Sequence, residues 1–98
     1  SGGQRQAIAI GRAVSFAHKV LIIDEPTADL AVKEVNEVLD KIRRLRDDGV
    51  GIILISHRLQ DVMAVSDRIM VMYEGLNVAE RNSADTNLQE VIELIVQA

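Results

Sequence analysis

The stretch VLIIDEPT, residues 20–27, decides the fold of this chain. Four branched apolar residues run directly into two adjacent carboxylates, Asp24 and Glu25. A short apolar run of this kind predicts a strand that is buried on both faces, as in a parallel sheet. Open α/β sheets bind ligands outside the carboxyl ends of their strands, so both carboxylates are candidate site residues. The alternative is a strand that ends in a solvated acidic turn.

A second apolar run lies downstream of a predicted helix. Residues 31–48 have apolar side chains at helical spacing on one face, and GIILI at 51–55 reads as another buried strand. This alternation of strand, helix and strand predicts parallel pairing with a right-handed crossover. Both strands then end at the same sheet edge, which would bring His57 near Asp24 and Glu25. The alternative role for His57 is to form a structural hydrogen bond at a strand end.

The first residues, SGGQ at 1–4, precede a segment rich in Ala and Ile that predicts a largely buried helix over 5–17. Serine is a preferred N-cap, and the glycines would let backbone N–H groups approach a phosphate at the helix start. The alternative is an ordinary capped helix after a glycine turn.

The last third of the chain predicts a different arrangement. A short helix is expected near 59–66, followed by two strands, 68–73 and 76–80, joined at Glu74-Gly75 as a hairpin. Asn87 is expected to cap a final amphipathic helix. The predicted fold class is therefore α/β: a parallel sheet with flanking helices, followed by a C-terminal β-hairpin and helix.

Composition limits the function classes. The 98 residues suffice for one small domain, and a net charge of −4 argues against a nucleic-acid partner. The absence of cysteine excludes disulfides and thiolate metal sites. No apolar run approaches the roughly 18 residues that span a bilayer. Because the chain starts at Ser1, inside an apparent motif, we expect it to be a fragment of a longer protein.

The motifs SGGQRQ, VLIIDEPT and ILISHR, in this order and spacing, resemble the ATP-binding cassette (ABC) ATPases of transporters. The resemblance covers residues 1–98 and implies the C-terminal portion of a P-loop NTPase-like nucleotide-binding domain, with its signature, Walker B, D-loop and H-loop segments. The stretch DEPTADLAVKEV resembles the corresponding sequence in the ATP-binding subunits of simple-sugar importers.

The resemblance implies roles for individual residues. Asp24 would support Mg²⁺, Glu25 would be the general base that orients the attacking water, and His57 would reach the γ-phosphate of ATP. The signature residues would grip the γ-phosphate of ATP held by the opposite subunit; they are Ser1, Gly2, Gly3 and Gln4. These roles suit phosphoryl transfer, which needs positioning and charge stabilisation more than covalent chemistry.

The sequence also departs from the family pattern. No G-x-x-x-x-G-K-[ST] motif occurs, so the Walker A half is absent from these residues. The D-loop carries Ala28-Asp29-Leu30-Ala31 where the family often has S-A-L-D. Ala31 therefore replaces an aspartate, which puts the contact of this loop across the dimer in doubt.

The resemblance implies an ATP-hydrolysing subunit that energises a membrane importer, with a second ATP-binding cassette and transmembrane permease subunits as partners. It would be a peripheral protein on the cytoplasmic face of the cell membrane. Two alternatives remain: a non-transport ABC-type ATPase, and a truncated fragment with no activity of its own. Because the phosphate loop is absent, the isolated chain is expected to be inactive.

Overall fold

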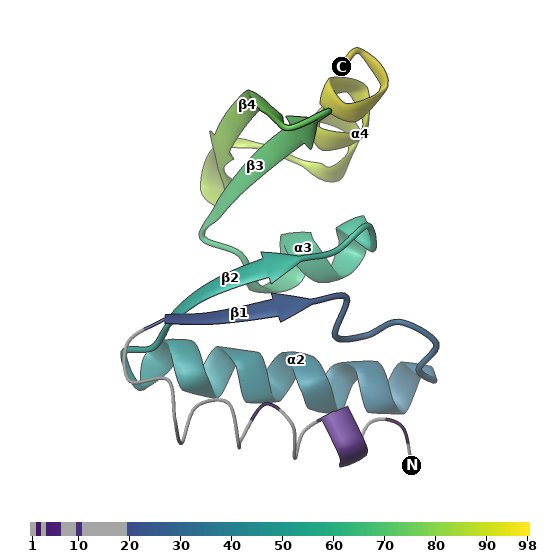
Figure 1. The fold of residues 1–98 in the computed structure, drawn as a ribbon, viewed down its shortest axis with the longest axis vertical. Coiled ribbons are helices and arrows are strands. Elements are labelled where there is room, and N and C mark those ends of the chain that lie inside the picture. Colours follow the sequence, from purple (N-terminus) through teal and green to yellow (C-terminus); the bar gives the residue numbers. More distant parts are fainter. Residues whose placement is uncertain (1, 3, 7–9, 11–19) are drawn as a thin grey trace. The chain divides into compact units, whose positions relative to one another are not determined.

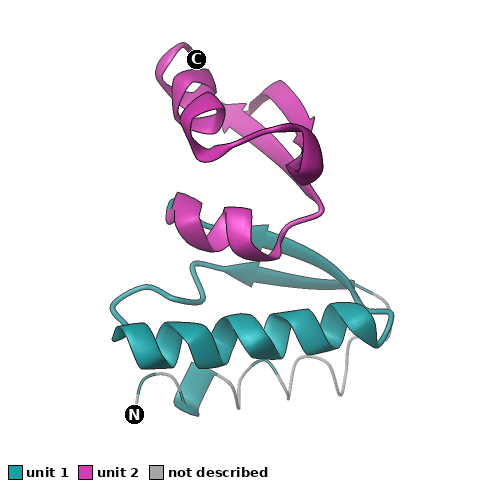
Figure 2. Ribbon diagram, turned by 180° about the vertical axis from the view of Figure 1, so that it is seen from behind, with its two compact units in different colours: residues 1–57 teal, residues 58–98 magenta. Residues whose placement is uncertain are grey.

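The computed structural model describes residues 2, 4–6, 10 and 20–98 (Figure 1). These residues fall into two compact units, residues 1–57 and 58–98, which Figure 2 colours separately. The single domain expected from the chain length is thus divided directly after His57. The helices and strands follow one another in the order β1 (Val20–Asp24), α2 (Val32–Asp47), β2 (Gly51–Ile55), α3 (Leu59–Val65), β3 (Arg68–Tyr73), β4 (Leu76–Asn82), η1 (Ser83–Asp85) and α4 (Leu88–Val96).

The sheet of the first unit is parallel, as predicted. β1 pairs with β2 in a register that runs from Val20 opposite Gly51 to Asp24 opposite Ile55. The carboxyl ends of the two strands therefore meet at one edge, where Asp24 ends β1, Glu25 follows it, and His57 comes two residues after β2. The predicted α/β class is confirmed in this unit.

The burial of the strands differs from the prediction. Leu21 and Ile23 are 5% and 6% exposed, whereas Val20 and Ile22 are 55% and 65% exposed. Successive side chains of a strand point to opposite faces, and α2, which packs against β2, covers one of them (Figure 1). The prediction that β1 is buried on both faces is therefore wrong for the described residues.

Helix α2 is amphipathic and has contrasting ends. It buries one stripe of side chains, namely Val35, Val38, Leu39, Ile42 and Leu45. Its N-cap, Ala31, makes no side-chain hydrogen bond. At the other end, Gly49 adopts φ 91° and its N–H donates to the Arg46 carbonyl at 2.9 Å, which ends the helix.

The second unit confirms the predicted hairpin and terminal helix. β3 and β4 pair antiparallel, with a register irregularity between Val71 and Met72. They are joined at Glu74 and Gly75, which have φ of 47° and 80°. Two central residues with positive φ are what a tight hairpin turn requires. The Asn87 side chain caps α4 by accepting from the Glu90 N–H at 2.9 Å.

The predicted N-terminal helix lies largely outside the described residues. Gly2, residues 4–6 and Ile10 are helical, and Ile10 is buried. Ser1 and Gly3 are outside the described set. No helix in the described part of the chain is long and apolar enough to cross a bilayer.

Candidate functional site

The ends of β1 and β2 present Glu25 in an unusual conformation. Its N–H donates to the Ile55 carbonyl at 2.7 Å, which extends the ladder one residue beyond β1. Its carbonyl accepts from the Ala28 N–H at 3.3 Å, which closes a turn. Its φ is 49°, in the left-handed region that non-glycine residues enter at a cost. Such strain is typical of functional sites.

Two donors from His57 hold one oxygen of this carboxylate. Glu25 Oε1 accepts from the His57 backbone N–H at 3.1 Å and lies 2.8 Å from His57 Nδ1. An ionised carboxylate only accepts hydrogen bonds, so Nδ1 carries the hydrogen in this pair. The His57 side chain is 82% exposed and that of Glu25 is 32% exposed. The second ring nitrogen, Nε2, is not used in the pair.

The other oxygen of the carboxylate is different. Glu25 Oε2 is buried and has no hydrogen-bond partner among the residues that the structure describes. Buried acceptors are normally satisfied, so an unpaired carboxylate oxygen calls for an unseen partner. The Glu25 carboxylate is thus oriented through Oε1, while Oε2 is unpaired; a general base needs an oriented oxygen whose acceptor capacity is unused.

Asp24 lies beside this pair on the backbone, is exposed and has Ile55 as its cross-strand neighbour. Within the described residues no three His, Cys, Asp or Glu side chains form a cluster that could hold a metal ion. The carboxylates of Asp24 and Glu25 alone would still suit Mg²⁺. Proteins usually bind this ion through one or two carboxylates together with waters and substrate phosphates.

The signature residues are only partly described. Gly2 lies against the loop that follows Glu25, since a Cβ atom added to it would come within 2.9 Å of Leu30 Cδ2 and 3.8 Å of Glu34 Oε2. Gln4 is exposed. The structure therefore brings Asp24, Glu25 and His57 together at one edge and seats Gly2 on the adjoining loop.

Two loop residues escaped the sequence analysis. Thr27 is 1% exposed, and its carbonyl accepts from the Leu30 N–H at 3.4 Å. Leu30 then reaches Gly2. The sequence signal that could have indicated this role is Leu30 itself, a large apolar residue in a short loop of small and polar residues.

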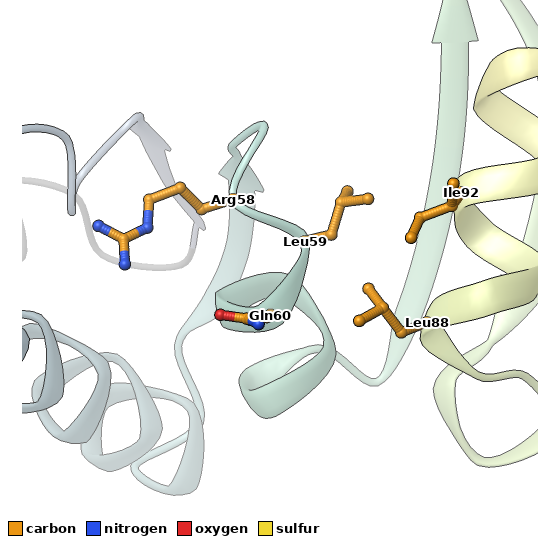
Figure 3. A pocket seen from close by; sticks show the side chains of 5 residues that line it. All are labelled: Arg58, Leu59, Gln60, Leu88 and Ile92. Carbon is orange, nitrogen blue, oxygen red and sulfur yellow. The ribbon is translucent and has the colours of Figure 1, made fainter.

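The second unit contains a shallow pocket without catalytic groups. Figure 3 shows Leu59 of α3 and Leu88 and Ile92 of α4 turned toward one another, and Arg58 and Gln60 complete the lining. Arg58 Nε pairs with the buried Asp61 carboxylate at 3.1 Å. An apolar lining whose cation is already paired offers no acid–base chemistry, so the strand ends remain the candidate active site.

The sequence has clear relatives. The xylose/arabinose import ATP-binding protein XylG of Sulfolobus acidocaldarius is 41% identical over 95 residues, which cover 97% of this chain. The ribose import ATP-binding protein RbsA of Bacillus licheniformis is 41% identical over 98% of the chain. The galactose/methyl galactoside import ATP-binding protein MglA of Clostridium perfringens is 35% identical over 98% of it. No protein-family model matches the chain.

The fold agrees with these relatives. A nucleotide-free ATP-binding cassette from an ABC transporter matches 100% of the chain with a TM-score of 0.81 and 28% identity. The chain belongs to the ATP-binding cassette family. A cassette in its ADP conformation also matches 100% of the chain, with a TM-score of 0.81 and 29% identity. A dimeric cassette bound to ADP and Pi matches 85% of it, with a TM-score of 0.72 and 26% identity.

The match covers only part of each relative. This ABC chain spans 38% of the length of XylG, 20% of RbsA and 19% of MglA. It spans 37% and 41% of the first two cassette structures. The segment that contains Glu25 and His57 therefore corresponds to about two fifths or less of each of these relatives.

Proposed function

We propose that this chain is the C-terminal portion of a nucleotide-binding domain that hydrolyses ATP to energise a membrane importer of simple sugars. The observation that carries the proposal is the Glu25–His57 pair at the carboxyl ends of two parallel strands, with Oε1 held and Oε2 buried and unpaired. The import functions named for the matched relatives favour transport over a DNA- or ribosome-acting ATPase.

In this proposal Glu25 is the general base. Its Oε2 atom would accept a hydrogen bond from the attacking water and draw off its proton as the γ-phosphate is transferred. The two donors from His57 hold the carboxylate in one orientation, which reduces the entropy lost at the reaction. Asp24, one residue upstream, would hold Mg²⁺, and the ion would neutralise charge on the phosphates.

His57 would act as a polar clamp. A neutral imidazole that donates through Nδ1 to Glu25 can only accept through Nε2. To donate to a γ-phosphate, the ring must therefore release Glu25 or carry a second proton. His57 would thus hold the base in the absence of nucleotide and change partner when the phosphate arrives.

The remaining contacts to ATP would come from elsewhere. Residues 1–98 contain no G-x-x-x-x-G-K-[ST] loop, so the phosphates of a bound nucleotide would be cradled by the part of the cassette that the relatives carry beyond the matched segment. The signature residues would serve ATP on the opposite subunit; they are Ser1, Gly2, Gly3 and Gln4. The partners are a second cassette and transmembrane permease subunits, at the cytoplasmic face of the membrane.

The experiment compares two variants of the full-length protein that carries this chain. Glu25→Gln keeps the size of the side chain but removes the base, so turnover should fall roughly 10²-fold or more while ATP binding is retained. Glu37→Gln, an exposed glutamate on α2, is the matched control and should behave as wild type. Unchanged turnover in Glu25→Gln would assign the base to another residue.

Sugar import is tested separately. Cells that express the full-length protein with its permease should take up labelled pentose or hexose, and cells that carry Glu25→Gln should not. If the protein hydrolyses ATP but the cells take up no labelled sugar, the proposed ATPase activity would stand and the proposed sugar cargo would be wrong.

A further inference from the structure

We infer that Leu30 is a positioning residue that seats the signature glycine Gly2 against the loop carrying Glu25. The inference rests on the proposed function, because it links two parts of the proposed ATPase site. It starts from one distance: a Cβ atom at Gly2 would lie 2.9 Å from Leu30 Cδ2, closer than Cβ atoms approach other heavy atoms in proteins. The end of the Leu30 side chain therefore occupies the space that a Cβ atom at position 2 would need.

The loop between the two residues is built from short turns. The Ala28 N–H donates to the Glu25 carbonyl at 3.3 Å, and the Leu30 N–H donates to the Thr27 carbonyl at 3.4 Å. Thr27 is 1% exposed, and Asp29 has φ of 61°, so the middle of the loop is anchored and its backbone conformation is specific. A displacement of Leu30 would therefore be transmitted along this short loop to the turn at Glu25.

The start of α2 is held by no side-chain cap, which gives weight to the contact between Leu30 and Gly2. The N-cap Ala31 makes no side-chain hydrogen bond, and the next residue, Val32, is 76% exposed. Leu30 is thus an apolar side chain that links the entry to α2 with Gly2. The Gly2 segment would bind the phosphate of the opposite subunit, so its seat determines how well the two subunits close on ATP.

The test uses the full-length protein and two single variants. Leu30→Ala should lower turnover about tenfold, below the roughly 10²-fold that a misplacement of about 1 Å can cost. Its ATP affinity as a monomer should stay within about twofold, because the phosphate loop is elsewhere. Val32→Ala, the matched control on an exposed neighbour, should behave as wild type. Leu30→Met should recover most of the lost turnover, since Met fills a similar volume.

A second readout separates positioning from general stability. In the Glu25→Gln background, which should trap ATP, Leu30→Ala should weaken ATP-dependent dimerisation about tenfold at a temperature where both proteins are folded. A residue that contributes only to stability would lower the melting temperature and leave this dimerisation constant unchanged. That second outcome would overturn the inference. If Leu30→Ala does not fold, Leu30→Val takes its place in both assays.

A double-mutant cycle addresses the contact itself. Gly2→Ala should reduce turnover, and Leu30→Ala should make part of this loss disappear because it opens the space for the new Cβ. Losses that simply multiply would overturn the inference. If wild type hydrolyses no ATP, or Glu25→Gln changes nothing, the proposed function and the role of Leu30 fail together. If Glu25→Gln is inactive but Leu30→Ala equals Val32→Ala, only the role of Leu30 fails.

Discussion

The two units differ in how well their turns and caps are satisfied. In residues 1–57, Glu25 and Asp29 adopt positive φ without being glycine, α2 starts without a side-chain cap, and Glu25 Oε2 has no partner. In residues 58–98, positive φ occurs at Glu74 and Gly75, in the hairpin turn that requires it; Asn87 caps α4, whereas α3 begins at Arg58 without a side-chain cap. The non-glycine residues with positive φ outside a hairpin, Glu25 and Asp29, and the unpaired carboxylate oxygen therefore lie where the candidate chemistry is, as expected of functional sites.

The second unit also contains an unpaired buried side-chain atom. Ser83 Oγ is buried without a hydrogen-bond partner, and nothing in the structure explains it. An unpaired hydroxyl is a smaller penalty than an unpaired carboxylate oxygen, because charge raises the cost of desolvation. The unpaired atom in the first unit, Glu25 Oε2, is therefore the more costly of the two.

The largest expected effect concerns the two faces of β1. Ile23→Ala should reduce the free energy of unfolding by about 2–5 kcal/mol, because it leaves a cavity beneath α2. Ile22→Ala, on the exposed face, should change it by no more than about 0.5 kcal/mol. Urea unfolding of both variants checks this. Equal losses would mean that another part of the protein covers the exposed face.

The next effect is on turnover. His57→Ala in the full-length protein should reduce turnover about 10²-fold, since both the clamp and one restraint on Glu25 are lost. Binding of Mg-ATP should be largely retained. Gln60→Ala, an exposed neighbour in α3, is the control. A His57→Ala protein with a lower melting temperature but normal turnover per folded molecule would reduce His57 to a structural role.

The helix caps provide a matched pair of smaller effects. Ala31→Asp should add about 1 kcal/mol to the free energy of unfolding, because Asp is a favoured N-cap and Ala is not. Asn87→Ala should remove about 1 kcal/mol, because the bond to the Glu90 N–H is lost. Thermal unfolding of each variant measures the change. If Ala31→Asp is destabilising, this loop is already constrained by contacts other than its cap.

The smallest effect is at the hairpin. Glu74 holds φ of 47° in front of Gly75, a position where Asn is preferred. Glu74→Asn should therefore stabilise the second unit by about 0.5 kcal/mol, within the spread expected of a surface change. Hydrogen exchange of the β3–β4 amides would detect it. Faster exchange in the variant would contradict the assignment of the turn.

The sequence by itself determined the strands, the helices, the hairpin and the order of the motifs. Each depends on local patterns: apolar runs for β1 and β2, helical spacing for α2, a turn pair at Glu74-Gly75, and a cap at Asn87. Parallel pairing then follows from the crossover helix, so the meeting of Glu25 and His57 at one edge could be predicted.

Only the tertiary structure decided the finer features of the site. The burial of β1 on one face, the two donors from His57 to a single oxygen of Glu25, and the seat of Gly2 on Leu30 are not local. Each depends on which atoms from distant parts of the chain come within a few ångströms. Sequence spacing specifies which strand ends meet, whereas packing and backbone strain specify which oxygen is held and which is left open.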